Sequence, residues 1–219
     1  VLYQYDQYFD AENGCDLQTT LDTTIQYYLE KGVQELEARF GTGKGATGIV
    51  MDVNTGAVLA MASLPTYDLN DPSVIYNDFL TAGMTEEEII ENATDLRNKQ
   101  WRSKAINDTY EPGSTFKTLT LAMALEENVV DMNTSFYCGG NMTVEGQKIW
   151  CSKRTGHGQQ DLSTAFANSC NPAFMNIGLR IGNAKFYQYM KDFGLMEKTG
   201  VDTTGEASGF ANKEIEYST

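Results

Sequence analysis

The segment from Pro112 to Glu126 constrains the fold of this chain more than any other. It begins with a proline, which favours the first turn of a helix, and the eight residues from Thr118 to Leu125 carry no charge. A helix that is apolar on nearly every side belongs inside a domain and not on its surface. Lys117 lies one turn into this predicted core helix, and buried lysines are rare because burial disfavours the charged form. The fold must therefore accommodate an amine within a largely apolar helix.

The composition is that of a globular protein, and its charge excludes some functions. Apolar residues make up 41% and charged residues 21% of the 219, so disordered or fibrous structure is not expected. The 30 acidic residues outnumber the 16 basic ones, which gives a net charge of −14. This charge argues against binding to nucleic acids or anionic membranes, because both need a positive surface. The chain also has no run of roughly 18 apolar residues that could span a bilayer.

Two elements are predicted in the first third of the chain. Asp22 can cap a helix that ends at Gly41, and its apolar residues recur at steps of three and four to form one buried stripe: Ile25, Leu29, Val33, Leu36 and Phe40. Residues 48–53 and 57–63 are apolar runs on either side of Asn54-Thr-Gly56, a pattern typical of a β-hairpin. Because both runs are almost wholly apolar, we expect both faces of this sheet to be covered.

Further helices are predicted later in the chain. Thr85 and Glu88 form the pattern of a capping box for a short acidic helix. Residues 98–110 are polar and show no clear period. Two helices are then expected over residues 172–182 and 183–194, each ending at a glycine.

Two short motifs carry groups that can do chemistry. Ser114 and Lys117 are three residues apart, so on a helix their hydroxyl and amine share a face. Burial would lower the pKa of the lysine and make it a proton acceptor for the serine. Taken alone, SxxK also fits a helix start with a surface lysine. Ser169-Cys-Asn171 adds a hydroxyl and a carboxamide between two helices, although the same triplet fits a helix cap before Pro172.

The cysteines allow more than one interpretation. Cys138 and Cys151 enclose a Gly-rich stretch that can form a loop, and His157 lies just beyond it. A zinc site made of these residues and Cys170 is one interpretation, but no CxxC or HxxxH spacing supports it, so we assign no metal. A Cys138–Cys151 disulfide and free thiols are the alternatives.

The two motifs together resemble a known family. Glu111-Pro-Gly-Ser-Thr-Phe-Lys117 followed by Ser169-Cys-Asn171 looks like the transpeptidase domain of class B penicillin-binding proteins, whose motifs are SxxK, S-D-N or its equivalent, and K-T-G. The resemblance covers roughly residues 16–210. Cys138-Gly139 and Asn168–Pro172 are most similar to the clostridial and bacillar branch, including its sporulation-specific and division-specific members. Other similar stretches are residues 16–26, 48–65, 156–158 and 193–206.

This resemblance implies the fold. It is an α/β (α+β) fold of the serine β-lactamase and penicillin-binding-protein type, with an antiparallel sheet flanked by helices and an all-helical subdomain. Residues 1–15 would be a linker from a preceding module, and residues 16–219 a transpeptidase domain whose last strands and closing helix lie beyond Thr219. Lys198-Thr-Gly200 spells the third motif. We nevertheless expect it to be a loop beyond a helix end, because its flanks do not resemble a strand.

The resemblance also implies a reaction and site residues. Ser114 would attack the carbonyl between two D-alanines of a peptidoglycan stem peptide, with Lys117 as the base. Ser169 would relay a proton to the departing D-alanine, and Asn171 would bind the backbone amide of the substrate. The Ser114 N–H and a second N–H from the missing strand would hold the oxyanion, so the isolated chain should have little activity. β-Lactams would acylate Ser114, and no cofactor is implied.

The implied setting is the extracytoplasmic face of a bacterial membrane. The full-length protein would be anchored by an N-terminal helix outside this chain and would work with a membrane glycosyltransferase; a nucleic-acid partner is not expected. Two alternatives remain. A β-lactamase or β-lactam sensor would use the same SxxK chemistry, although the long entry helix favours the synthase. A scaffold or fragment of the same fold would have no catalysis.

Overall fold

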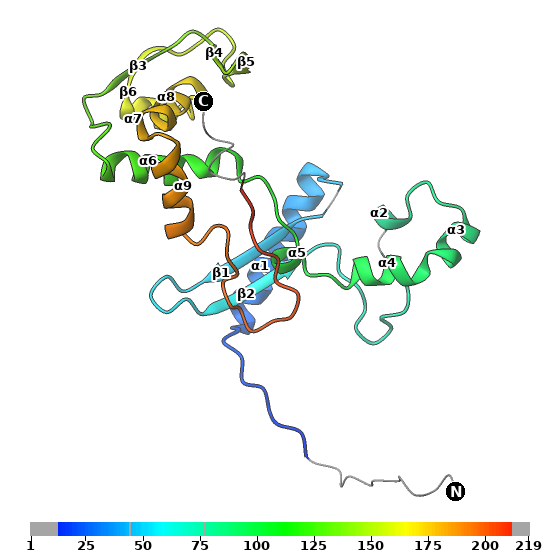
Figure 1. The fold of residues 1–219 in the computed structure, drawn as a ribbon. Helices are drawn as coiled ribbons and strands as arrows, with labels where there is room; N and C mark the ends of the chain where they lie inside the picture. Colours follow the sequence, from blue (N-terminus) through cyan, green and yellow to red (C-terminus); the bar gives the residue numbers. More distant parts are fainter. Residues whose placement is uncertain (1–12, 44, 77, 212–219) are drawn as a thin grey trace, which may run out of the picture. The chain divides into compact units, whose positions relative to one another are not determined.

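The computed structural model describes residues 13–43, 45–76 and 78–211 of the chain (Figure 1). The chain divides into two compact units, the first ending at Ala105 and the second beginning at Ile106. Helices occur in both units, and every strand pair is antiparallel. The fold is therefore α+β, as predicted. Among the described residues no helix is both long and apolar enough to cross a bilayer.

The first unit is built on helix α1 (Thr23–Phe40) and a hairpin of β1 (Thr47–Met51) and β2 (Val58–Ser63). The helix begins and ends as predicted: Asp22 Oδ1 accepts hydrogen bonds from two backbone N–H groups of the first turn, and Gly41 ends the helix with a φ of 54°. A positive φ suits glycine because it has no Cβ. The helix packs along the hairpin.

Burial in the first unit is less complete than the sequence predicts. Val33 is buried, but Leu36 and Phe40 at the end of the expected stripe are 45% and 67% exposed. The expectation that both faces of the hairpin are covered is wrong for β1, where Ile49 and Met51 are exposed. Side chains alternate between the two faces of a strand, and only one face of this hairpin lies against α1.

Three short helices complete the first unit: α2 (Asp78–Thr81), α3 (Glu86–Glu91) and α4 (Ala93–Gln100). The capping box of Thr85 and Glu88 is present at the start of α3. Residues 98–110, which show no clear period in the sequence, nevertheless contain the end of α4 at Gln100 and the whole of α5 (Lys104–Asn107), which lies at the boundary of the units. The Gln100 carboxamide is buried and bonds the backbone of Val74 and Tyr76, an arrangement that helical periodicity does not reveal.

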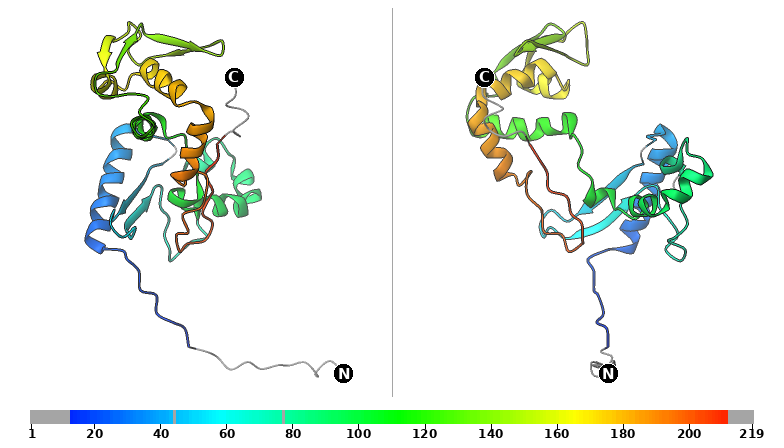
Figure 2. Two further views of the ribbon diagram at one scale, coloured as in Figure 1. Left: turned by 60° about the vertical axis from the view of Figure 1, so that its left-hand side comes forward. Right: turned by 45° about the vertical axis from the view of Figure 1, so that its right-hand side comes forward.

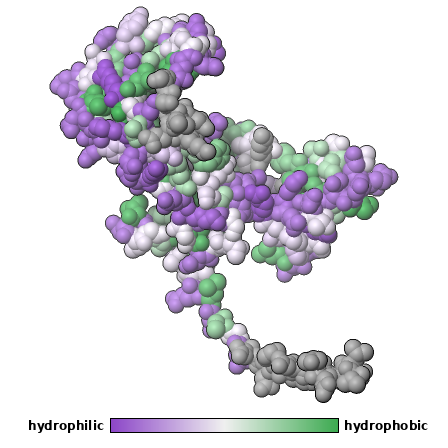
Figure 3. Space-filling model, viewed as in Figure 1, coloured by the Kyte–Doolittle hydropathy of each residue, from purple (hydrophilic) through white to green (hydrophobic). Residues whose placement is uncertain are grey.

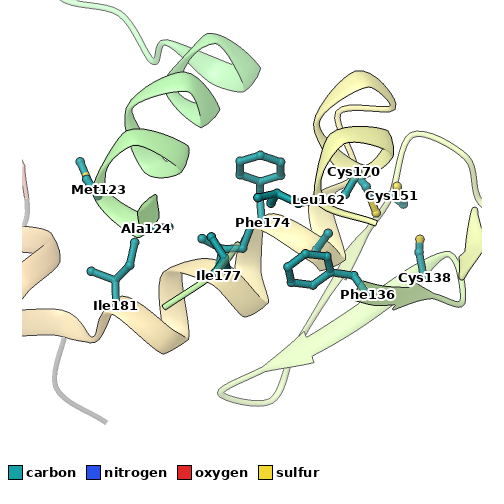
Figure 4. Close-up of a cluster of buried hydrophobic side chains, with 13 residues drawn as sticks. Met123, Ala124, Phe136, Cys138, Cys151, Leu162, Cys170, Phe174, Ile177 and Ile181 are labelled. Carbon is teal, nitrogen blue, oxygen red and sulfur yellow. The ribbon is translucent and has the colours of Figure 1, made fainter. Parts of the chain in front are cut away.

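The second unit has its core between α6 (Lys117–Glu126) and α8 (Asn171–Ile181), which pack against each other (Figure 4). A 3₁₀ turn, η1 (Gly113–Phe116), precedes α6, so the α-helix begins five residues later than the expected start at Pro112. Helices α7 (Leu162–Ala167) and α9 (Asn183–Asp192) flank α8. Helix α6 is buried on one side only, with Leu125 44% exposed. The prediction that this helix is buried on all sides is therefore only partly correct.

The Gly-rich stretch expected to form a loop contains strands. β3 (Ser135–Cys138) pairs with β6 (Gly158–Asp161), and β4 (Asn141–Val144) pairs with β5 (Gln147–Trp150). β3, β4 and β5 lie beside α8, and β6 lies beside α7; Figure 2 shows this part of the chain in two further views. Glu145 and Gly146 both have positive φ, as a tight hairpin turn requires. The strands β4 and β5 are short and none of their residues is buried, so their sequence resembles that of a loop. The face of the molecule shown in Figure 3 is mostly hydrophilic, with scattered apolar residues.

Candidate active site

The amine of Lys117 is the centre of the candidate site. Its Nζ donates hydrogen bonds to the backbone oxygen of Ser169 at 2.7 Å, to the Oγ of Ser169 at 2.9 Å and to the Oδ1 of Asn171 at 2.7 Å. The Oγ of Ser114 lies 3.4 Å from the same Nζ. The structure therefore brings all four residues of the two predicted motifs together around one amine.

Ser114 is held at the start of the α6 segment by a 3₁₀ turn. Residues three apart in a 3₁₀ helix lie directly above one another, so this turn aligns Ser114 with Lys117. Gly113 begins the turn with a φ of 59°, and Thr115 Oγ1 donates to the backbone oxygen of Pro112 at 2.6 Å. The serine is solvent-exposed while the lysine is half-buried. The hydroxyl is therefore open to a substrate and the amine is sheltered behind it.

Ser169 and Asn171 lie on the connector between α7 and α8. Ser169 has a φ of 47°, in the left-handed region that non-glycine residues seldom adopt. Neither residue caps α8, because the N-cap position is Cys170 and no side chain makes a cap hydrogen bond there. The helix-cap alternative is thus wrong. The Nδ2 of Asn171 donates to the backbone oxygen of Trp150 at 2.9 Å, so both ends of this carboxamide are bonded within the protein.

The surroundings of Lys117 weaken its hold on a proton. Burial disfavours the ammonium form and lowers the pKa of Lys117, while the nearby Cys151 and Cys170 act in the opposite direction, and the net shift is downward. The centroid of the Phe174 ring lies 5.6 Å from Nζ, and the ring face, like the two cysteines, favours the ammonium form. A lysine with a lowered pKa is neutral more often near pH 7 and can accept a proton.

Three cysteines and the histidine gather beside this connector. The sulfur atoms of Cys138, Cys151 and Cys170 and a ring nitrogen of His157 all lie within 4.8 Å of one another. Figure 4 shows the three sulfur atoms at one end of the core cluster. All cysteines in the described part of the chain are free, so the structure contains no Cys138–Cys151 disulfide there. The missing CxxC and HxxxH spacings made a shared site look unsupported, yet the four side chains converge.

The Lys198-Thr-Gly200 sequence lies in a loop beyond α9, as predicted, and not on a strand. The carboxylate of Glu206 accepts hydrogen bonds from the backbone N–H and Oγ1 of Thr199 at 2.7 and 2.6 Å, and from the N–H of Gly200 at 3.1 Å. The hydrogen bond from the Thr199 hydroxyl is the largest cause of the lowered pKa of Glu206. The backbone N–H groups of Thr199 and Gly200 are therefore already bonded to Glu206, a residue of the same loop.

A cleft of about 960 Å³ lies beside the exposed serine. Its walls include Gly113 and Thr115 on either side of Ser114, together with apolar side chains such as Leu119 and Phe186. Lys117, Ser169 and Asn171 do not line it. The candidate reacting groups are therefore identified by their hydrogen bonds to the Lys117 amine and not by the lining of the cleft.

Comparison with known proteins connects this geometry to a family. A family model described as the penicillin binding protein transpeptidase domain matches residues 46–219. The chain is similar to Stage V sporulation protein D of Bacillus subtilis (strain 168), with 36% identity over 210 residues that cover 93% of this chain and 28% of the relative. It is also similar to the peptidoglycan D,D-transpeptidase MrdA of Haemophilus influenzae, with 29% identity over 202 residues that cover 90% of this chain and 28% of that protein.

A solved structure gives the same result. The D,D-transpeptidase domain of a peptidoglycan glycosyltransferase from Eggerthella lenta superposes with a TM-score of 0.70 and 27% identity, covering 90% of this chain and 42% of that one. The chain thus spans 28% of the length of the two curated relatives named above.

Proposed function

Because the chain belongs to the penicillin-binding protein transpeptidase family, we propose that it carries the reacting groups of a peptidoglycan D,D-transpeptidase. The observation that carries this proposal is the position of the Lys117 Nζ, within hydrogen-bonding distance of the Oγ atoms of both Ser114 and Ser169. One amine beside two hydroxyls can move a proton from a nucleophile to a leaving group.

The bonding of Lys117 supports its role as the base. A neutral amine has two N–H donors and one lone pair. The backbone oxygen of Ser169 and the Oδ1 of Asn171 can only accept hydrogen bonds, and both lie 2.7 Å from Nζ. These two acceptors occupy the two N–H groups, and the lone pair is left for a hydroxyl. Ser114 and Ser169 are the hydroxyls within reach.

The proposed acylation step balances as follows. Lys117 accepts the hydroxyl proton of Ser114, whose Oγ forms a bond to the carbonyl carbon between two D-alanines. The carbonyl electrons move to oxygen, where the N–H of Ser114 stabilises the negative charge. When the C–N bond breaks, the proton passes from Lys117 to the departing amine through Ser169, which lies 2.9 Å from Nζ. An amine of a neighbouring stem peptide then attacks the ester carbon, and the bond from that carbon to the Oγ of Ser114 breaks as the cross-link forms. The proton that the amine loses passes through Lys117 to the Oγ of Ser114, which restores the hydroxyl.

Asn171 acts beside this relay. Its Oδ1 holds Lys117, and its Nδ2 is directed to the backbone of Trp150. The carbonyl oxygen of an amide has two lone pairs, so Oδ1 can bond Lys117 and also accept from a substrate amide. This is the substrate-binding role that we propose for Asn171.

We further propose that the 219 residues alone are acylated slowly. Within the described ranges no strand carries a Lys-Thr-Gly sequence, since Lys198-Thr-Gly200 is in a loop. The Ser114 N–H is then without the second oxyanion donor that a catalytic strand would supply. Loss of one such donor typically slows a reaction by about 10²–10³.

The proposed setting follows from the relatives. Bacterial proteins with these names act in cell-wall synthesis or sporulation, and we infer the extracytoplasmic face of a bacterial membrane as the place of action. The substrates would be peptidoglycan stem peptides, with β-lactams as covalent inhibitors. An N-terminal membrane anchor and a glycosyltransferase partner would belong to the full-length protein. Similarity to Stage V sporulation protein D favours a role in sporulation over division.

Labelled penicillin tests this function. The full-length protein should form a covalent adduct, and peptide mass spectrometry should place it on Ser114. The Ser114→Ala variant should lose the adduct. Ser163→Ala, which removes an exposed serine on α7, is the matched control and should react normally.

The alternatives give different results in the same experiment. A β-lactamase would release the penicilloyl group within the assay and turn over the antibiotic many times. A scaffold would form no adduct. An adduct on another serine would refute the assignment of the nucleophile.

A further inference from the structure

We propose that Lys148, Trp150 and Arg154 bind a carboxylate of the acyl-donor peptide, carried by the residue that precedes its two D-alanines. The binding site stands on the positions of two cations at one aromatic ring. Its part in selecting the acyl donor rests in addition on the proposed function.

Two cationic side chains lie against the ring of Trp150. The Nζ of Lys148 is 4.4 Å and the Cζ of Arg154 is 4.6 Å from the ring centroid. All three side chains are exposed to solvent. An aromatic ring attracts a cation at its face, but a second cation at the same ring adds repulsion between like charges. A bound group of opposite charge would offset this repulsion.

The surrounding sequence does not supply that group. Residues 146–160 contain Lys148, Lys153 and Arg154 but none of the 30 acidic residues of the chain. Within the described ranges neither Lys148 nor Arg154 forms a salt bridge, although acidic residues outnumber basic ones. Both charges are therefore available to an anion from outside the chain.

The backbone already holds the two cationic residues near each other. Lys148 and Trp150 are two residues apart on β5, so their side chains share one face of the strand. Ile149 points to the other face, where it lines a small groove beside α8. The loop of Arg154 is packed closely, since a Cβ placed on Gly140 would lie 2.0 Å from the Arg154 backbone oxygen. Little ordering of the backbone is then needed when a ligand binds.

These residues adjoin the group that we propose binds the substrate amide. The carboxamide of Asn171 bonds Lys117 through its oxygen and the backbone of Trp150 through its nitrogen. A peptide that extends from Ser114 across Asn171 therefore reaches the end of β5 next. One extended residue spans about 3.3–3.6 Å, so the residue before the D-alanine pair is the one that lies beside this strand.

The chemistry of the site favours a single carboxylate over a larger anion. A guanidinium can hold both oxygens of a carboxylate through two parallel N–H bonds, and arginine commonly stacks on aromatic faces. The net charge of −14 repels an extended anionic surface such as a lipid bilayer. A small group is affected mainly by the charges within about 10 Å, because salt screens those farther away. A carboxylate on the substrate is thus the ligand that fits.

Peptide binding tests the site without acylation. Full-length Ser114→Ala protein would be titrated with acetylated Glu-D-Ala-D-Ala and with acetylated Gln-D-Ala-D-Ala, which differ by one carboxylate. The emission of Trp150 should change, because the ligand alters the contacts between its ring and the two cations. Trp150→Phe should lose this signal, and Trp101→Phe, in the first unit, should keep it. The glutamyl peptide should bind roughly three- to tenfold more tightly at low salt, and high salt should remove the preference.

Further variants in the same Ser114→Ala background locate the preference. Lys148→Ala combined with Arg154→Ala should abolish the difference between the two affinities, whereas Lys148→Arg, which keeps the charge, should retain it. Lys191→Ala is the matched control, because Lys191 also lies over an aromatic ring, 4.6 Å from the centroid of Tyr187. It should keep the full preference for the glutamyl peptide.

Three results would overturn the site. The first is the absence of a saturable emission change with the glutamyl peptide. The second is equal affinity for the two peptides, and the third is an unchanged preference in the folded double variant. Vesicles containing phosphatidylglycerol provide a further comparison. Equal peptide affinities together with vesicle binding that the double variant loses would assign the cations to lipid instead.

Acylation kinetics test the selection of the donor separately. Thioester donors with acetylated Glu-D-Ala or Gln-D-Ala as the acyl group would be compared on protein with Ser114 intact. The glutamyl donor should have the larger second-order acylation constant. The Lys148→Ala and Arg154→Ala double variant should lose this selectivity while it reacts normally with benzylpenicillin, whose acyl side chain has no charge. Equal constants for the two donors would refute a role in donor selection. If neither the donors nor penicillin form an adduct, the proposed function fails while peptide binding still decides the site.

Discussion

The side-chain nitrogen of Asn171 donates a hydrogen bond to the backbone oxygen of Trp150 at 2.9 Å, and this bond fixes which way the carboxamide faces. Its oxygen must then point to the other side, where Lys117 donates to it at 2.7 Å. The end of β5 thereby orients a group that touches the proposed base. An exchange of the amide for a carboxylate would disturb both bonds at once.

We therefore expect Asn171→Asp to slow acylation by penicillin at pH 7 by tenfold or more. A carboxylate beside Lys117 favours the ammonium form and raises the pKa of the lysine, so less of the neutral base is present. It also faces the backbone oxygen of Trp150 with no proton to donate. Acylation rates measured across pH should show the profile moved to higher pH. Asn168→Asp, a charge change in the same connector, is the control, and an equal loss there would contradict the specific role of Asn171.

Lys117→Ala should reduce the acylation rate by a factor on the order of 10² or more, because the nucleophile loses its proton acceptor. Lys117→Arg should not restore the rate, since an arginine does not give up its proton in proteins. Stopped-flow measurement with a chromogenic β-lactam would provide the rates. Lys191→Ala, which removes a lysine on α9, should react normally. A near-normal rate in Lys117→Ala would mean that another group takes the proton.

The lowered pKa of Lys117 predicts two pH dependences. The acylation rate should rise with pH through that pKa, because only the neutral amine accepts a proton. The free energy of unfolding should also rise with pH between the lowered pKa and the ordinary lysine value. In that range the unfolded chain binds more protons than the folded one. Urea titrations at several pH values should show this slope, and the slope should diminish in Lys117→Met. A rate that falls with rising pH would exclude the amine as the base.

Lys198→Ala should leave acylation of the full-length protein within a few-fold of normal. The residue lies in a loop whose threonine and glycine bond to Glu206, so we expect no part for it in binding the oxyanion. Penicillin labelling with a check of folding would decide the matter. Complete loss of labelling in a folded variant would make Lys198 catalytic.

Gly156→Ala should destabilise the second unit more than Gly146→Ala. Both glycines have positive φ, which costs alanine about 1–2 kcal/mol. Only at Gly156 would the added Cβ also meet a backbone oxygen, that of Cys138 at 2.3 Å, whereas nothing lies within 4 Å at Gly146. Thermal unfolding of the two variants isolates the cost of this contact. Equal unfolding midpoints of the two variants would show that the backbone of Gly156 does not lie tightly against that of Cys138.

The elements that sequence analysis found share a local cause. The cap of α1, the capping box of α3 and the hairpin turn at residues 54–56 all depend on neighbouring residues, and each is present. Lys117 and the three residues around it were found because each motif is short and supports a resemblance. Their roles in the reaction stay predictions until the adduct and rates are measured.

What the sequence concealed depends on contacts between distant segments. Strands β4 and β5 have few buried side chains, so their residues show no alternation to distinguish them from a loop. Sequence analysis could name Cys138, Cys151, His157 and Cys170 as one possible cluster, but it could not show that they converge, because only the folded chain brings their segments together. The apolar stretch in α6 indicated a core helix correctly, but it could not show which side would be covered.

The backbone conformation of Ser169 lowers the stability of the folded protein, while the Ser169 side chain supplies a hydroxyl next to Lys117. Its φ of 47° is one that glycine would adopt freely, and holding serine there costs about 1–3 kcal/mol. Ser169→Gly would relieve that strain and could give a more heat-resistant protein, yet it would remove the hydroxyl that lies 2.9 Å from Lys117. A screen that selects variants for thermal tolerance alone would thus favour loss of the proposed proton relay, whereas one that selects for cross-linking should retain the strained serine.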